Sequence, residues 1–176
     1  MSSFLQQLPA LIGVVIGALG SYLAVVRGDR VRFRREQEAR WDERRLAVYA
    51  EWAQALKRTV SVDYRVAAHL GNDPHPHPLS PEEAEPLLAA AQLDRDPYGE
   101  KLIMLGSPAV VGKAQEWVLA VMEMERFLRE GRQEPAAWRI LLDRQRDGRD
   151  GYYAAVRADL ALPPGHSGRL PLPEEM

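Results

Sequence analysis

The amino-terminal segment carries no charge, and this feature constrains the fold more than any other. The first charged side chain is that of Arg27, and residues 8–26 read LPALIGVVIGALGSYLAVV, nineteen residues without a charge. A helix needs about 20 apolar residues to cross the hydrocarbon core of a membrane. Helices buried in a soluble core rarely lack every charge over this length. The sequence therefore predicts a transmembrane helix over about residues 8–26.

A cluster of arginines directly after this segment predicts how the chain is oriented. Its members are Arg27, Arg30, Arg32, Arg34 and Arg35. A cleaved signal peptide carries its positive charge before the apolar run, whereas positive charge after the run retains the following chain in the cytoplasm. We therefore expect a single-pass signal anchor in the cell membrane, with the amino terminus outside and the carboxyl-terminal domain in the cytoplasm. The same arginines are candidate contacts for anionic lipid headgroups.

Small residues recur every four positions within the apolar segment, at Gly13, Gly17 and Ser21. This spacing places them on one face of a helix, where a second helix can approach closely. The three residues are therefore a candidate helix-association face for a homodimer.

Beyond Arg27 the chain is rich in charge and its apolar residues recur at helical spacing, as at Leu56, Val60, Ala67 and Leu70. The sequence predicts an all-α protein in which one transmembrane helix precedes an Arg-rich helical stalk and a cytoplasmic antiparallel four-helix bundle. The expected divisions are an amino-terminal segment over residues 1–26, a stalk over 27–45, the bundle over 46–162 and a disordered tail over 163–176. Trp41, Trp52, Trp117 and Trp138 are expected to pack in the core.

Proline and its neighbours predict where the helices begin and end. Residues 72–79 contain three prolines and are expected to form a loop. Ser80 and Glu83 fit a capping box, and Ser107 before Pro108 fits a second helix start. Pro135 is expected to open the last helix, whose middle Gly148 and Gly151 should weaken.

The second helix of the bundle is harder to delimit. Pro86 is expected either to kink this helix or to move its start to Glu85, and residues 94–97 are expected to interrupt it. Residues 98–106 fit either a helix or a short buried strand, and helix is favoured because no second strand is available for pairing.

Three segments, RRLAVYAEWAQALKR, LGSPAVVGKAQEW and YYAAVRADL, resemble a group of membrane-anchored helical proteins of actinobacteria that have no assigned biochemistry. The resemblance covers most of the chain and implies a small cytoplasmic bundle behind a membrane anchor. It carries no catalytic residues across.

The sequence holds few groups that predict chemistry. It has no cysteine, which excludes disulfides and thiolate metal ligands. The imidazoles of His69, His75 and His77 and the carboxylate of Asp73 have the spacing of a weak metal site, but the Pro-rich loop does not place such ligands in advance. Residues 106–113, GSPAVVGK, depart from the phosphate-binding loop pattern in spacing and in lacking the hydroxyl after the lysine. The carboxylates of Glu82, Glu83 and Glu85 fit a helix first turn, where its dipole stabilises them.

The predicted function is accordingly a membrane-tethered cytoplasmic interaction or scaffold module with no catalytic activity and no cofactor. Its expected partners are the bilayer, a second copy of the transmembrane helix and a protein whose identity the sequence does not specify. The alternatives are anionic-lipid or nucleic-acid binding through the basic stalk, or an enzyme with an unrecognised site. Nucleic acid is disfavoured because 23 Lys and Arg stand against 25 Asp and Glu. An enzyme is disfavoured because a compact bundle of Ala and Leu leaves little room for a pocket.

Overall fold

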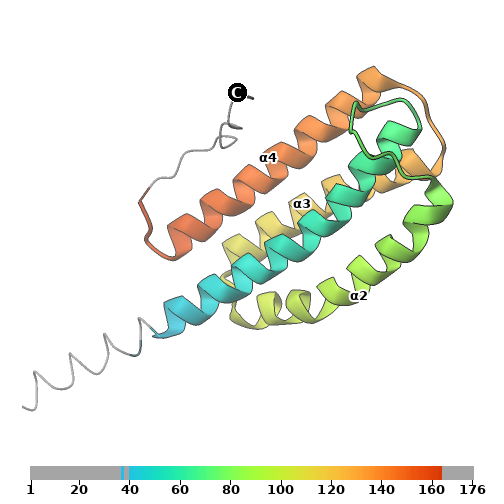
Figure 1. The fold of residues 1–176 in the computed structure, drawn as a ribbon. Coiled ribbons are helices and arrows are strands. Elements are labelled where there is room, and N and C mark those ends of the chain that lie inside the picture. The colour runs from blue at the N-terminus through green and yellow to red at the C-terminus, as the bar shows by residue number, and fades with distance from the viewer. Residues whose placement is uncertain (1–36, 38–39, 164–176) are drawn as a thin grey trace, which may run out of the picture. The chain divides into compact units, whose positions relative to one another are not determined.

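The computed structural model describes residue 37 and residues 40–163 (Figure 1). The chain divides into two compact units, Met1–Glu43 and Arg44–Met176. The predicted transmembrane segment, the arginine cluster and the tail after residue 163 lie outside the described residues. Among the residues that are described, no helix is both long and apolar enough to cross a membrane.

Four helices and no strand make up the described part of the chain, which confirms the all-α prediction. The first helix covers residues 40–69 and is followed by α2 (Pro81–Leu105), α3 (Pro108–Arg129) and α4 (Pro135–Asp159). The first helix runs antiparallel to α4, through the pairs Tyr49–Tyr152 and Tyr64–Trp138. It also runs antiparallel to α2, through the pairs Glu51–Lys101 and Arg58–Asp94.

Local signals start and stop these helices largely as predicted. The Ser80 hydroxyl accepts a hydrogen bond from the Glu83 N–H at 3.3 Å, and the Glu83 carboxylate accepts one from the Ser80 N–H at 3.0 Å. This capping box satisfies donors that the first helical turn leaves without partners. At the start of α3 the Ser107 hydroxyl accepts a hydrogen bond from the Val110 N–H, without a reciprocal bond. Gly71 and Gly131 adopt positive φ angles just after the first helix and α3, a conformation that terminates helices at little steric cost to glycine.

The predicted interruption of α2 is wrong. This helix begins at Pro81, not at Glu85, and runs unbroken to Leu105 through Pro86 and Pro97. The two prolines deprive the carbonyls of Glu82 and Leu93 of their helical donors. Both residues are exposed, and Leu93 retains 73% of its accessible surface, so water can donate hydrogen bonds to these carbonyls. Residues 98–105 are helical, which confirms the favoured alternative, and α2 follows a curved path in Figure 1.

All four helices contribute side chains to the core, and aromatic side chains lie at its centre. The rings of Trp52, Trp117 and Tyr152 lie within 5.7 Å of one another between centroids, and the first two meet edge to face. Trp138 is also buried, so three of the four tryptophans occupy the core as predicted. Trp41 does not, because 50% of its surface is exposed at the start of the first helix.

Gly148 lies at a close approach between α3 and α4. The helix α4 continues through both Gly148 and Gly151, so neither breaks it. A Cβ atom added at Gly148 would lie 3.0 Å from the Cα of Trp117, which is tighter than ordinary van der Waals contact. The absence of a side chain therefore lets α4 pack directly on the backbone of α3, which explains a residue that otherwise disfavours a helix.

A polar network joins the first helix to the ends of α3 and α4. The carboxylate of Asp159 accepts hydrogen bonds from the Tyr49 hydroxyl at 2.7 Å and from the guanidinium of Arg45. The Tyr49 hydroxyl also accepts from the Ser107 N–H at 3.4 Å. Burial opposes ionisation of Asp159, but these hydrogen bonds, led by that of Tyr49, outweigh burial and hold its pKa below the ordinary value.

Replacing Tyr49 with Phe is expected to lower the free energy of unfolding by about 1–2 kcal/mol, because the buried hydroxyl bonds to a charged group. Urea unfolding of the full chain, followed by tryptophan emission, measures this change. Tyr98→Phe is the matched control and should cost less than about 0.5 kcal/mol. Equal effects of the two substitutions would contradict a stabilising role for the network.

Candidate functional site: a groove at Asp63

A groove of about 490 Å³ lies between the first helix, α2 and α3. Its volume falls within the range of about 300–1,000 Å³ that is typical of small-molecule sites. The lining residues include Thr59, Asp63 and Val66 of the first helix, Ala84 and Leu88 of α2, and Leu128 of α3. The sequence-based expectation that the bundle leaves little room for a pocket is therefore wrong.

The carboxyl group of Asp63 is the unusual feature of this groove. Only 1% of Asp63 is exposed, and neither of its carboxylate oxygens has a hydrogen-bond partner in the structure. A buried polar group without a partner costs about 1–3 kcal/mol, and a charged one costs more. Most buried polar side chains are paired in native proteins. Among the described residues the Asn72 Oδ1 and the Trp117 Nε1 also have no partner, but Asp63 is the one such group that can ionise, so it calls for an explanation.

The surroundings of Asp63 favour its protonated form. Burial is the main cause and raises the pKa of Asp63 well above its ordinary value. The nearby negative charge of Glu125 raises this pKa further, whereas the guanidinium of Arg129 lowers it. Arg129 lies 3.9 Å from the Glu125 carboxylate and is largely exposed, so it offers Asp63 no close ion pair. Perturbed carboxyl groups in clefts are frequent at functional sites.

The sequence of α2 explains why a groove remains beside Asp63. Only Ala84, Ala91 and Leu102 of this 25-residue helix are buried, and two of these three have small side chains. Large apolar residues of α2 point outward instead, among them Ile103 and Met104. The apolar side of α2 is thus short of volume, and the space that larger side chains would fill stays open.

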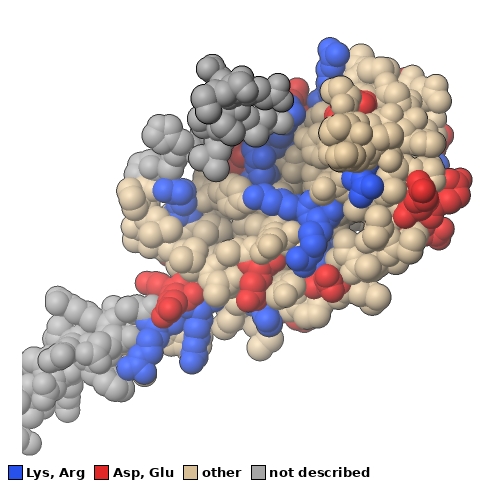
Figure 2. Space-filling view, in the orientation of Figure 1, with Lys and Arg blue, Asp and Glu red and all other residues tan. Residues whose placement is uncertain are grey.

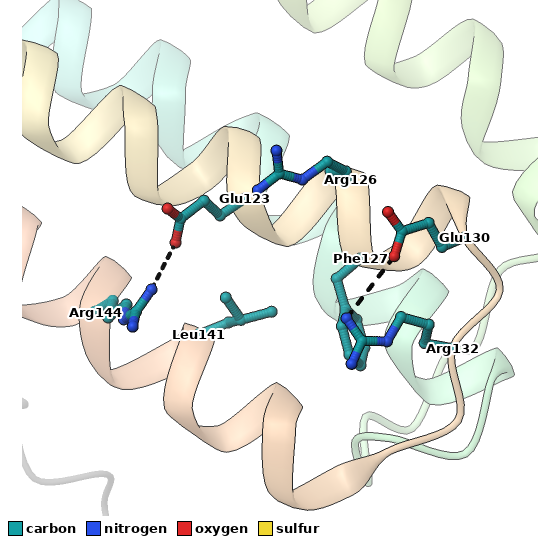
Figure 3. Close-up of a pocket in the computed structure, with 7 residues that line it drawn as sticks. All are labelled: Glu123, Arg126, Phe127, Glu130, Arg132, Leu141 and Arg144. Atoms are coloured by element: carbon teal, nitrogen blue, oxygen red, sulfur yellow. Dashed lines mark hydrogen bonds and ion pairs between the residues drawn. The ribbon is translucent and has the colours of Figure 1, made fainter.

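Three other hollows are weaker candidates, because two are small and the third has as its unpartnered buried group the neutral amide oxygen of Asn72, which costs less to bury than a carboxylate. Figure 3 shows a hollow of about 210 Å³ between α3 and α4, in which Arg144 pairs with Glu123 and Arg132 pairs with Glu130. A second, of about 240 Å³, lies between the first helix and α4. The largest, of about 640 Å³, includes Asp73, whose two carboxylate oxygens accept from the His75 N–H and the Trp138 indole N–H.

The residues singled out in the sequence lie elsewhere, with one exception. The candidate association face of Gly13, Gly17 and Ser21 and the candidate lipid contacts of the arginine cluster (Arg27, Arg30, Arg32, Arg34 and Arg35) fall outside the described residues. Within the described part, no group of three or more His, Cys, Asp or Glu side chains could hold a metal ion. In the Pro-rich loop, the ring Nδ1 of His75 accepts a hydrogen bond from the His77 N–H. The exception is the acidic turn of α2, where Glu83 completes the capping box while Glu82 and Glu85 line the groove.

Sequence reasoning missed Asp63, although a signal was present. The apolar stripe of the first helix passes through Leu56, Val60 and Ala67, and helical spacing places Asp63 on the same side, between Val60 and Ala67. A lone carboxyl group in an apolar stripe is the pattern that marks a buried charge.

Comparisons with known proteins leave the class of this bundle open. No protein-family model, no curated protein and no solved structure matches the chain. The resemblance to membrane-anchored actinobacterial proteins therefore stays a prediction.

Proposed function

We propose that this chain is a membrane-tethered module whose helical bundle binds a small organic ligand in the groove at Asp63, without catalysing a reaction. The observation that carries the proposal is the buried carboxyl group of Asp63, which has no hydrogen-bond partner. A ligand that donates a hydrogen bond to this carboxyl group would remove the free-energy cost of leaving it without a partner. The free energy gained would add to the binding affinity.

A binding role accounts for the groove better than the other functions considered. Apolar lining residues such as Val66, Leu88 and Leu128 supply contact area, and one buried polar group supplies orientation, which is the usual composition of a ligand site. Figure 2 shows acidic and basic side chains interspersed over one face of the described residues, whereas nucleic-acid-binding proteins gather Lys and Arg on one face.

An enzyme is the second candidate, because a carboxyl group with a raised pKa can act as a general acid near neutral pH. It would release an altered product when given its substrate, whereas a binding module releases the ligand unchanged. Mass spectrometry of the ligand after prolonged incubation with the full chain separates these two functions.

Groove binding is tested by photolabelling the full chain in phosphatidylcholine nanodiscs with a neutral diazirine derivative of 3-phenylpropan-1-ol. Ala89 and Ala90 are both exposed, but only Ala89 lines the groove, so Ala89→Trp places a bulky side chain at the site while Ala90→Trp is a matched control. We expect labelled peptides from α2 and α3 in the native chain and in Ala90→Trp, and at least a tenfold loss in Ala89→Trp. Equal labelling of the two variants, or no labelling of groove peptides, would contradict the proposal.

The membrane tether rests on the apolar segment and the arginines that follow it. Protease treatment of spheroplasts is expected to leave a carboxyl-terminal tag intact, because positive charge after the span holds the bundle inside. An amino-terminal tag should be digested in the same cells. Loss of the carboxyl-terminal tag from sealed spheroplasts would reverse the proposed topology.

Self-association through the small residues of the segment is a separate part of the proposal. Replacing Gly13 and Gly17 with Ile is expected to lower crosslinking in native membranes several-fold, because the larger side chains prevent close helix contact. Replacing Val14 and Val15 with Ile, on other positions of the segment, is the control. Unchanged crosslinking in the glycine variant would remove this face as a dimer contact.

A further inference from the structure

The groove at Asp63 is lined by more acidic than basic side chains. Carboxyl groups come from Asp63 of the first helix, Glu82 and Glu85 of α2 and Glu125 of α3, whereas guanidinium groups come from Arg95 of α2 and Arg129 of α3. One of the two cations is engaged, because Arg129 forms an ion pair with Glu125 at 3.9 Å. The charge around the groove therefore opposes an anionic ligand and favours a cationic one.

The buried carboxyl group of Asp63, one of the residues that line the groove, also favours a cationic ligand. The two oxygens of Asp63 are hydrogen-bond acceptors without donors, and burial penalises their negative charge. A neutral donor would satisfy an oxygen but would not favour ionisation of the buried carboxyl group. An ammonium group supplies up to three N–H donors and a full positive charge, and charge-assisted hydrogen bonds are about twice as strong as neutral ones.

The other residues that line the groove limit which chemical group can be attached to the cation. Pro81, Ala84, Leu88 and Ala89 of α2 and Val66 and Leu128 of the neighbouring helices present apolar surface. A strongly hydrated cation such as a metal ion would lose its water against this surface without gaining ligands. The lining instead fits a compact hydrocarbon or aromatic body attached to the ammonium group.

We propose that the ligand of this groove is a small organic amine in its protonated form, with its ammonium group on the carboxylate of Asp63 and its apolar body against α2 and α3. This inference rests on the proposed function and narrows it to one class of ligand.

Binding of an ammonium ion to this site has a consequence for protons. The carboxyl group of Asp63 is protonated in the empty groove at pH values where an ordinary aspartate is ionised, because burial raises its pKa. Pairing with the ammonium ion requires the carboxylate, so the Asp63 proton passes to the buffer and the ammonium ion keeps its own. The other charged groups that line the groove are those of Glu82, Glu85, Arg95, Glu125 and Arg129. Binding at pH 7 should therefore release up to one proton per ligand.

The test compares three probes with the same body and different heads, namely 3-phenylpropylammonium, 3-phenylpropan-1-ol and 3-phenylpropanoate. Isothermal titration calorimetry uses the full chain in phosphatidylcholine nanodiscs, with empty nanodiscs as reference, in two buffers that differ in ionisation enthalpy. We expect the ammonium probe to bind at least tenfold more tightly than the alcohol, the carboxylate to bind weakest, and the measured heat of ammonium binding to depend on the buffer.

Two variants make the result specific. Asp63→Asn should weaken ammonium binding at least tenfold and abolish the buffer dependence, whereas Asp143→Asn, the same change on the exposed side of α4, should do neither. Alcohol binding equal to or tighter than ammonium binding, or ammonium binding unaffected by Asp63→Asn, overturns the inference and leaves the proposed groove function standing. Failure of all three probes to bind, together with failed photolabelling, overturns both.

Discussion

Replacing Asp63 with Asn is expected to raise the free energy of unfolding of the bundle at pH 7, because asparagine carries no ionisation penalty; the gain is about 1.4 kcal/mol for each unit by which burial raises the pKa of Asp63, up to the pH of the measurement. The substitution keeps the size and shape of the side chain and removes its ability to ionise. Most substitutions of buried residues destabilise a protein, so a gain at this position would be diagnostic. It would indicate a residue retained for binding at the expense of stability.

The gain in stability from Asp63→Asn should increase as the pH rises. Burial raises the pKa of Asp63 in the folded chain above that of the unfolded chain, so the folded state holds the proton more tightly. Below the unfolded pKa of about 4, both states are protonated and Asp63 imposes no ionisation penalty. As the pH rises from there toward the folded pKa, only the unfolded state gains from losing its proton, and stability falls.

Urea unfolding of the native chain and of Asp63→Asn in nanodiscs, followed by tryptophan emission between pH 3.5 and pH 8, measures this difference. Other groups, including Asp159 with its lowered pKa, contribute equally to both chains and cancel. The free energy of unfolding of the variant should increase relative to that of the native chain as the pH rises. A difference that stays constant with pH, or that favours the native chain at pH 8, would show that Asp63 is ionised without penalty.

Replacing Gly148 with Val is expected to lower the free energy of unfolding by about 3 kcal/mol, at the upper end of the usual cost of overpacking. Even the first carbon of the new side chain would lie 3.0 Å from the Cα of Trp117, and a backbone atom cannot move aside as a flexible side chain can. Valine then adds two methyl groups where α4 packs directly on the backbone of α3.

Gly112 provides the control, because it lies within α3 and an added Cβ atom there meets nothing within 4 Å. Gly112→Val should change the stability by less than about 0.5 kcal/mol, since valine has a slightly higher helix propensity than glycine. The same urea titration serves both variants. A similar small effect at both glycines would show that α3 and α4 are not held together at Gly148.

The sequence predicts α3 and α4 well because their local and tertiary signals agree. Ser107 and Pro108 form a cap, and Val110, Ala114, Trp117 and Val121 recur at helical spacing and are all buried. Local preference and core packing therefore favour the same helix, so such segments can be predicted from the sequence alone.

The helix α2 is harder to predict because its signals conflict. Pro86 and Pro97 disfavour a helix locally, yet the capping box at Ser80 and contacts such as the burial of Leu102 favour one. Exposure of the carbonyls that the prolines leave without donors reduces the cost of both residues. That exposure depends on how α2 lies against the bundle, which the order of residues does not reveal.

The groove could be predicted from the sequence only in part. The position of Asp63 in the apolar stripe indicates a buried carboxyl group, but it does not show whether a partner lies nearby. In the structure the nearby charged groups of Glu125 and Arg129 form an ion pair with each other, and the small side chains of α2 leave space beside Asp63. The pairing of Glu125 with Arg129 is local to α3. The placement of this pair and of the small α2 side chains beside Asp63, however, depends on packing between residues of different helices that are more than twenty positions apart in the chain.

The most direct test of this account is the ionisation of Asp63 itself, observed by the ¹³C resonance of its side-chain carboxyl group in the full chain. Comparison with the spectrum of Asp63→Asn assigns the resonance. Without ligand, we expect the carboxyl group to stay protonated well above pH 4, and at a pH below its titration midpoint we expect addition of 3-phenylpropylammonium to shift the resonance to that of the carboxylate. A titration near the ordinary pKa of about 4, with no response to the amine, would contradict the account.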